Sequence, residues 1–117
     1  MLSNIYYFVN EKGEKPVKEF IDNLSTQEQA KVFAYLVELL QQGHNLRRPM
    51  ADYLAHGIHE LRPKDKRIFY FFFFKESVVL VHAIKKETAK IPKNDLELCL
   101  KRKVQVEKLR NIEKVEL

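Results

Sequence analysis

One run of apolar residues limits the possible folds of this chain more than any other feature. Ile68 to Phe74 are seven consecutive aromatic or aliphatic residues. The run is too short to cross a membrane as a helix, and aromatic residues in a short run are typical of a strand. Because successive side chains of a strand point to opposite faces, both faces of this strand should be covered. We therefore expect it to lie in the centre of a sheet.

Neighbouring segments predict hairpins around this strand. The sequence indicates three successive strands, at about Gly57–Arg62, Arg67–Phe74 and Val78–Lys86. Short polar turns at Pro63–Lys66 and Lys75–Ser77 separate them, so antiparallel hairpins are the natural connection. The preceding segment, 44–56, has no periodicity and is expected to form a loop.

The N-terminal part predicts a strand followed by two helices. Ile5–Val9 is β-branched and aromatic, Pro16 suits a first helical position, and Ser25–Glu28 matches a capping box. Gly43 is expected to end the second helix. The predicted core positions are Val17, Phe20, Ile21 and Leu24 in the first helix and Phe33, Leu36, Val37 and Leu40 in the second.

A third helix is predicted from Pro92, with Leu96, Leu100 and Val104 facing the core. The highly charged segment 105–117 is expected to extend beyond the domain. Residues 1–117 thus predict a single α+β domain of order β-α-α-β-β-β-α, with a small antiparallel-rich sheet and a helical hairpin on one face. The other face would be concave and free to bind a partner.

Composition favours an anionic partner and a reduced compartment. Lys and Arg number 21 against 16 Asp and Glu, a net charge of +5, for which nucleic acid is the leading partner. Cys99 is the single cysteine, is expected to be buried, and cannot form an intrachain disulfide. The four histidines form no helical ligand pair, so neither a metal nor another cofactor is predicted. No secretory signal or membrane segment is recognised, which predicts a cytoplasmic protein.

Strand alternation predicts a polar cluster on one face of the sheet. If Lys75–Glu76 is a two-residue turn, Phe74 faces Ser77, Arg67 lies opposite Ile84, and Phe69 lies opposite His82. Glu60, Arg62, Arg67, His82 and Lys86 then share one face around an aromatic side chain. A one-residue change in the turn would move His82 to the other face and bring Lys85 beside Arg67.

Each member of this cluster has a structural alternative. Arg62 and Arg67 could pair with Glu60 at a sheet edge, although a residue at a strand start such as Arg67 is expected to be exposed. His82, between Val81 and Ala83, could be half-buried and bonded to a backbone carbonyl. Lys85, Lys86 and Lys90 could be ordinary solvated charges.

The order of these motifs resembles a known family. Glu60-Leu61-Arg62, Arg67-Ile68-Phe69-Tyr70, Val79 to Lys86 and Lys90-Ile91-Pro92 are similar to the central signature of RelE/HigB-type toxins, in particular the phage-related HigB-like branch. The resemblance extends over nearly the whole chain to about Lys103. It implies an endoribonuclease that cuts messenger RNA on the ribosome and is inhibited by an antitoxin protein, expected to carry a helix-turn-helix domain.

The resemblance also implies roles for residues. Arg67 matches the arginine that contacts the scissile phosphate in RelE-type enzymes, and Arg62 matches a second arginine of the pattern. Two departures are clear: Glu60 stands where RelE-type enzymes have a lysine, and no tyrosine lies near the start of the last helix. The full set of predicted catalytic residues is Arg62, Arg67, His82 and Lys86, and the predicted RNA-binding residues are Arg47, Arg48, Lys64, Lys66, Lys85 and Lys90.

The implied chemistry is attack of a ribose 2′-hydroxyl on the adjacent phosphate, which needs no metal. Arginines suit the phosphoryl group, and His82 suits proton transfer near neutral pH, with a lysine or Glu60 as the alternative base. Two rival hypotheses use the same residues: a non-catalytic RNA- or DNA-binding module, and a degenerate toxin that retains only antitoxin binding.

Overall fold

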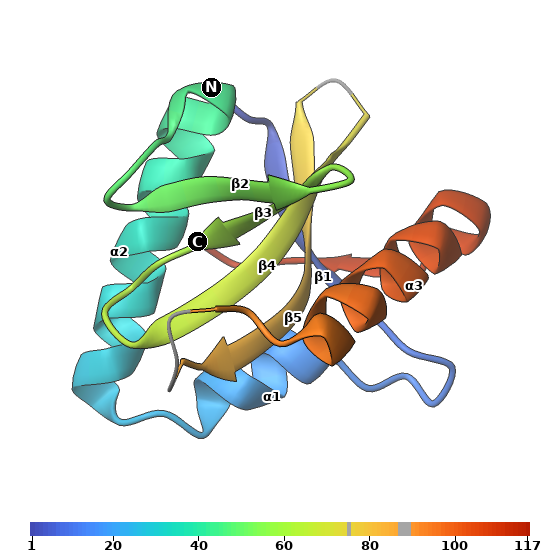
Figure 1. The fold of residues 1–117 in the computed structure, drawn as a ribbon, viewed down its shortest axis with the longest axis horizontal. Coiled ribbons are helices and arrows are strands. Elements are labelled where there is room, and N and C mark those ends of the chain that lie inside the picture. Colours follow the sequence, from blue (N-terminus) through green and yellow to red (C-terminus); the bar gives the residue numbers. More distant parts are fainter. Residues whose placement is uncertain (75, 87–89) are drawn as a thin grey trace.

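The computed structural model describes residues 1–74, 76–86 and 90–117. In this part of the chain, six strands form one sheet in the order β2-β3-β4-β5-β1-β6, and three α-helices pack against it (Figure 1). The sheet is antiparallel except for the parallel pair β1 and β5. The elements are β1 (Asn4–Phe8), α1 (Pro16–Asp22), α2 (Thr26–Gln42), the 3-10 helix η1 (Gly43–Asn45), β2 (Ala51–Ala55), β3 (Ile58–Leu61), β4 (Lys66–Phe73), β5 (Ser77–Lys85), α3 (Lys93–Leu109) and β6 (Ile112–Lys114).

The predicted α+β class is confirmed, but the prediction omitted two strands. β2 lies within the segment that was expected to be a loop. Its sequence contains two alanines and an aspartate, which have low strand propensity, so its pairing with β3 is set by the hairpin. The connecting residues His56 and Gly57 both have positive φ, 53° and 85°, as a tight two-residue hairpin turn requires.

Helices α1 and α2 cover one face of the sheet, as predicted for the helical hairpin. The capping box at Ser25 and Glu28 is present, and Gly43 is the C-cap of α2, with φ of 53°. The buried stripe of α2 is rotated from the predicted one: it consists of Val32, Leu36 and Leu39, whereas Val37 is 39% exposed.

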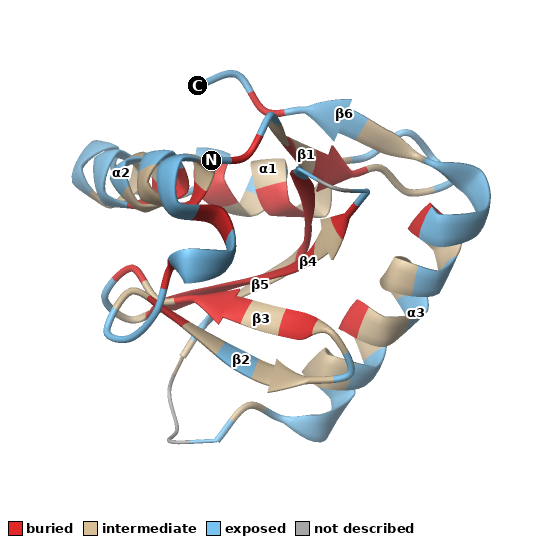
Figure 2. Cartoon of the chain, turned by 90° about the horizontal axis from the view of Figure 1, so that it is seen from above, coloured by how far each residue is buried: buried red, intermediate tan, exposed pale blue. Residues whose placement is uncertain are grey.

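The other face of the sheet is not free, which corrects the prediction of an open concave face. Helix α3 lies across it, so β4 is covered on both sides as expected (Figure 2). Cys99 and Val106 face the sheet, while Val104, which was predicted to face it, is 48% exposed. Burial raises the pKa of the Cys99 thiol to about 12, so this cysteine stays protonated at neutral pH.

The C-terminal segment packs against the domain and does not extend away from it. Strand β6 pairs with β1, and Val115 is buried. The Asn111 side chain donates a hydrogen bond to the Val9 carbonyl at 2.6 Å. The expectation from the high charge of this segment is wrong because a short edge strand needs only one or two apolar side chains to pack against the domain.

The register between β4 and β5 agrees with the prediction, but for a different reason. Arg67 pairs with Ile84 and Phe69 with His82, as predicted, yet Ser77 pairs with Phe73 and not with Phe74. A bulge at Val81 adds one residue to β5 and restores the register beyond it. Arg102 of α3 donates a hydrogen bond to the Val81 carbonyl at 2.7 Å, which satisfies an acceptor of the bulge. Lys75, part of the predicted turn, lies outside the described residues.

Candidate functional site

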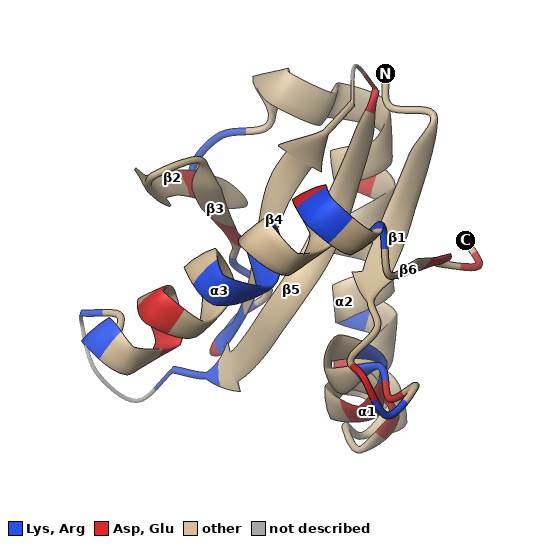
Figure 3. Ribbon diagram, turned by 90° about the vertical axis from the view of Figure 1, so that its right-hand side faces the viewer, with Lys and Arg blue, Asp and Glu red and all other residues tan. Residues whose placement is uncertain are grey.

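A cleft of about 300 Å³ opens between the β2–β3 side of the sheet and the beginning of α3. It lies on the α3 face of the sheet, because Leu96 of α3 and Ile91 form part of its wall. Figure 3 shows basic segments along the chain that follows β5 and around the start of α3. The polar residues that line the cleft are Arg48, Asp52, Tyr53, Glu60, Arg62, Lys86 and Lys90.

Glu60 is the buried centre of an arginine cluster beside this cleft. It is 2% exposed, and its Oε2 accepts a hydrogen bond from Arg62 Nη1 at 2.6 Å. Its Oε1 lies 3.7 Å from Arg67 Nε, and neither of these two buried atoms has a hydrogen-bond partner within the described residues. The carboxylate therefore holds two guanidinium groups in place and is not itself open to solvent.

The two arginines differ in accessibility. The Arg62 side chain lines the cleft and is 19% exposed. Arg67, expected to be exposed, is buried: its Nη1 donates hydrogen bonds to the carbonyls of Lys64 and Lys66 at 2.8 and 2.7 Å. Burial and, to a smaller extent, the Arg62 charge lower the pKa of the Arg67 guanidinium. Arg67 thus braces the β3–β4 turn, and Arg62 is the member of the pair that faces the cleft.

His82 is on the predicted face, but its ring is engaged elsewhere. Its Nε2 lies 2.7 Å from Asp95 Oδ1, in the first turn of α3, and its ring stacks on Phe69 at 5.7 Å between centroids. Phe69 is fully buried and pairs with Glu60 on one side and with His82 on the other. Since neighbouring strands are about 4.8 Å apart, His82 and Glu60 are separated by about 10 Å of sheet.

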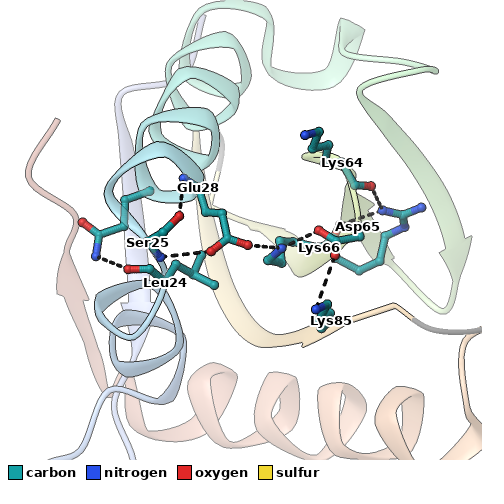
Figure 4. A network of polar contacts seen from close by, with 9 residues as sticks. Leu24, Ser25, Glu28, Lys64, Asp65, Lys66 and Lys85 are labelled. Carbon is teal, nitrogen blue, oxygen red and sulfur yellow. Dashed lines mark hydrogen bonds and ion pairs between the residues drawn. The ribbon is translucent and has the colours of Figure 1, made fainter.

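Lys66, one of the predicted RNA-binding residues, is buried in an ion-pair network. Its ammonium contacts Asp65 and lies 2.7 Å from Glu28 Oε2, next to the α2 capping box (Figure 4). Asp65 also lies 3.8 Å from Lys85, whose side chain is largely exposed. Burial lowers the pKa of Lys66, but hydrogen bonds to Asp65 and Glu28 outweigh that effect and raise it overall.

The remaining predicted basic residues are spread over three areas. Lys86 and Lys90 line the cleft, and Arg48, also in its wall, pairs with Asp52 at 2.9 Å. Lys64 is exposed at the β3–β4 turn, and Arg47 lies on the α2 side of the sheet, in a separate cavity. The structure therefore brings together Arg48, Arg62, Lys86 and Lys90, and it separates them from Arg47, Lys64, Lys66 and His82.

Within residues 1–74, 76–86 and 90–117, no group of three His, Cys, Asp or Glu side chains could hold a metal ion. In the same ranges, no helix is long and apolar enough to cross a membrane.

Comparison with known families identifies the chain. The family model of the phage-derived protein Gp49-like (DUF891) matches residues 19–104, which extend from α1 to α3 and include the whole cleft. The chain belongs to this family. The Gp49-like family is associated with the toxins of toxin–antitoxin systems. A search of curated proteins finds no match to the chain.

Two polar residues of the cleft, Asp52 and Tyr53, are not predicted from the sequence, because they lie on β2, which the sequence does not predict. Asp95, the partner of His82, is not predicted either, because the two residues are 13 positions apart along the chain. The His56-Gly57 pair was a signal for the β2–β3 hairpin and hence for the first two. No local pattern pointed to the His82–Asp95 contact.

Proposed function

We propose that this Gp49-like protein is the toxin of a toxin–antitoxin pair and an endoribonuclease that cuts messenger RNA on the ribosome. One observation carries the proposal: Arg62, Lys86 and Lys90 line a single cleft, beside a carboxylate that fixes the Arg62 guanidinium. Fixed cations around one phosphate are what the negatively charged transition state of phosphodiester cleavage requires. Family membership and the net charge of +5 support the same function.

The proposed reaction forms a bond between the ribose 2′-oxygen and the adjacent phosphorus and breaks the bond from phosphorus to the 5′-oxygen. Arg62 and Lys90 stabilise the extra negative charge on the phosphoryl oxygens. Lys86 accepts the 2′-hydroxyl proton. Water protonates the departing 5′-oxygen, and Lys86 then loses its extra proton to solvent. The products are a cyclic phosphate and a free 5′-hydroxyl end.

Proton transfer is assigned to a lysine because both carboxylates of the cleft wall are engaged in ion pairs. The described cleft wall contains no histidine, and its two carboxylates, Glu60 and Asp52, are paired with Arg62 and Arg48. A site with so little acid–base chemistry gains most of its rate from substrate positioning. Dependence on the ribosome, which would hold the message in a reactive geometry, follows from this.

The proposed partner is an antitoxin with a helix-turn-helix domain, as the resemblance to HigB-like toxins implies. The same geometry also favours one rival function, a non-catalytic RNA-binding module. The specific observation for it is that His82 contacts Asp95 outside the cleft and Glu60 is buried and paired with Arg62. Cleavage separates the two functions.

The decisive experiment is induced expression of the chain followed by mapping of RNA 5′ ends, repeated with purified protein, message, and ribosomes present or absent. We expect growth arrest, new 5′-hydroxyl ends within coding sequences, and cleavage only when ribosomes are present. Arg62→Ala should lower the cleavage rate by about 10²–10³-fold, the usual effect of removing one fixed charge donor.

The matched pair Lys86→Ala and Lys108→Ala controls for the loss of one positive charge. Lys108 is exposed near the end of α3 and does not line the cleft. Lys86→Ala should abolish cleavage, and Lys108→Ala should cleave at the wild-type rate. Intact transcripts and normal growth with soluble, folded wild-type protein would overturn the enzymatic function and leave the binding module.

A further inference from the structure

A second cavity, of about 380 Å³, lies on the opposite face of the sheet from the candidate cleft. Its walls come from the chain after α2 and from β2 and β3. One wall residue, His59, stacks on Tyr70, which belongs to the core between the sheet and α2. The residues that line it are His44, Leu46, Arg47, Arg48, Ala51, Asp52, Tyr53 and His59.

Aromatic and imidazole rings form one wall of this cavity. His44 stacks on Phe72 with centroids 3.7 Å apart and planes inclined by 18°, and the residue is exposed. Tyr53 meets His59 edge-on at 5.0 Å and is 55% exposed. Burial and, secondarily, the nearby His44 lower the pKa of His59, which favours the neutral form of this ring. Flat, partly exposed rings are stacking surfaces for nucleobases.

The charge at the rim of the cavity is positive. Arg48 pairs with Asp52, the single carboxylate among the described residues of the wall, at 2.9 Å, so these two charges balance. The Arg47 guanidinium is exposed and makes no hydrogen bond or ion pair with any residue the structure describes. One unpaired guanidinium next to stacking rings matches the two parts of a nucleotide, a phosphate and a base.

We propose that this cavity binds one nucleotide of single-stranded RNA, with its base on the His44 ring and its phosphate on Arg47. The inference rests on the proposed RNA substrate and adds a subsite to it. The two cavities share Arg48, Asp52 and Tyr53, and β2 is the last strand on this side of the sheet (Figure 2). An RNA strand that crosses the β2 edge therefore reaches both cavities, with the scissile phosphate in the cleft.

The test is binding of a fluorescent 2′-O-methyl hexanucleotide, which has no 2′-hydroxyl and cannot be cleaved. The variants are Arg47→Ala and His44→Asn, with Lys108→Ala and His56→Asn as controls matched for charge and for ring loss. His56 is exposed, lines neither cavity, and has a positive φ that asparagine tolerates. Loss of one stacked base should weaken binding by roughly 5- to 150-fold in His44→Asn. Both controls should bind as the wild type does.

Two further measurements make the proposal falsifiable. Polyphosphate, which has no bases, should bind to His44→Asn and to the wild type equally but more weakly to Arg47→Ala. Equal loss of polyphosphate and RNA binding in His44→Asn, or wild-type RNA affinity in both cavity variants with unchanged melting temperatures, would overturn the proposal. Failure of the proposed nuclease function is distinguished from failure of this subsite, because the wild type would then cleave no RNA, whatever the measured affinities.

Discussion

The His82 imidazole on β5 and the Asp95 carboxylate in the first turn of α3 are joined by a 2.7 Å contact between Nε2 and Oδ1. The contact connects the sheet to the helix that covers its second face. Both side chains are about one-fifth exposed, at 16% and 24%. The arrangement resembles the histidine–carboxylate pair of many hydrolases, yet the ring faces α3 and not the cleft, so a structural role fits it better.

His82→Gln and Asp95→Asn should each lower the melting temperature without abolishing cleavage. A charge-assisted hydrogen bond is worth about 1.5–3 kcal/mol when buried, and partial exposure reduces this to about 1 kcal/mol. A loss of that size shifts the melting temperature by about 4–8 °C. The double variant should lose little more than either single one, since both remove the same contact. Normal melting combined with loss of cleavage would instead assign His82 to proton transfer.

Glu60 should be more important for stability than any other charged residue of the site. Glu60→Ala leaves the buried Arg67 and the half-buried Arg62 without their carboxylate, and breaking a buried ion pair from one side costs about 3–5 kcal/mol. Urea denaturation should therefore give a much lower midpoint with an unchanged slope. Lys86→Ala, which removes a charge from the same cleft, should leave the midpoint within experimental error of the wild type.

The predicted pairing of Arg67 with Ile84 and of Phe69 with His82 is correct, although the turn from which it was predicted is not. Two local errors compensated each other: the turn after β4 is longer by one residue, and the bulge at Val81 adds one to β5. Had only one of them been present, His82 would face α2. A bulge leaves no clear trace in the residue types, so this agreement could not have been assured from sequence.

The burial of Arg67 and Lys66 could not be predicted from residue type. Both begin β4, where solvent exposure is the ordinary expectation, yet Lys66 is buried against Glu28 on α2 and Arg67 against Glu60 on β3. The Glu60 pairing was one of the two alternatives for Arg67, but the Glu28 pairing becomes apparent only once α2 has been placed against the sheet. The fold class could thus be predicted from the hydrophobic pattern of the sequence. Which lysines and arginines are buried in the fold, and which face the cleft, could not be predicted.

The Glu28–Lys66 contact should give a specific acid dependence of stability. The hydrogen bond from Lys66, followed by those from Ser25, lowers the pKa of Glu28 from 4.5 to about 2. Since the folded-state pKa is the lower one, the contact stabilises the fold above pH 4.5, and this stabilisation is lost as the pH falls towards 2. Wild type should lose stability over that range more steeply than Lys66→Met in urea titrations at several pH values. Parallel profiles for the two proteins would contradict the pairing.

The last prediction concerns the C-terminal strand, which lies in the charged segment that was expected to extend beyond the domain. Removing residues 111–117 deletes β6, the buried Val115 and the Asn111 hydrogen bond to Val9, and it exposes the edge of β1. The truncated chain should melt several degrees lower, and its newly exposed β1 edge should promote aggregation at high concentration. Val115→Asp should reproduce the loss of stability in the full-length chain, because it places an unpaired charge at a 3% exposed position. Glu116→Ala, at the exposed neighbouring position, is the control and should melt as the wild type does. Wild-type melting temperatures for both the truncation and Val115→Asp would show that β6 does not contribute to the fold in solution.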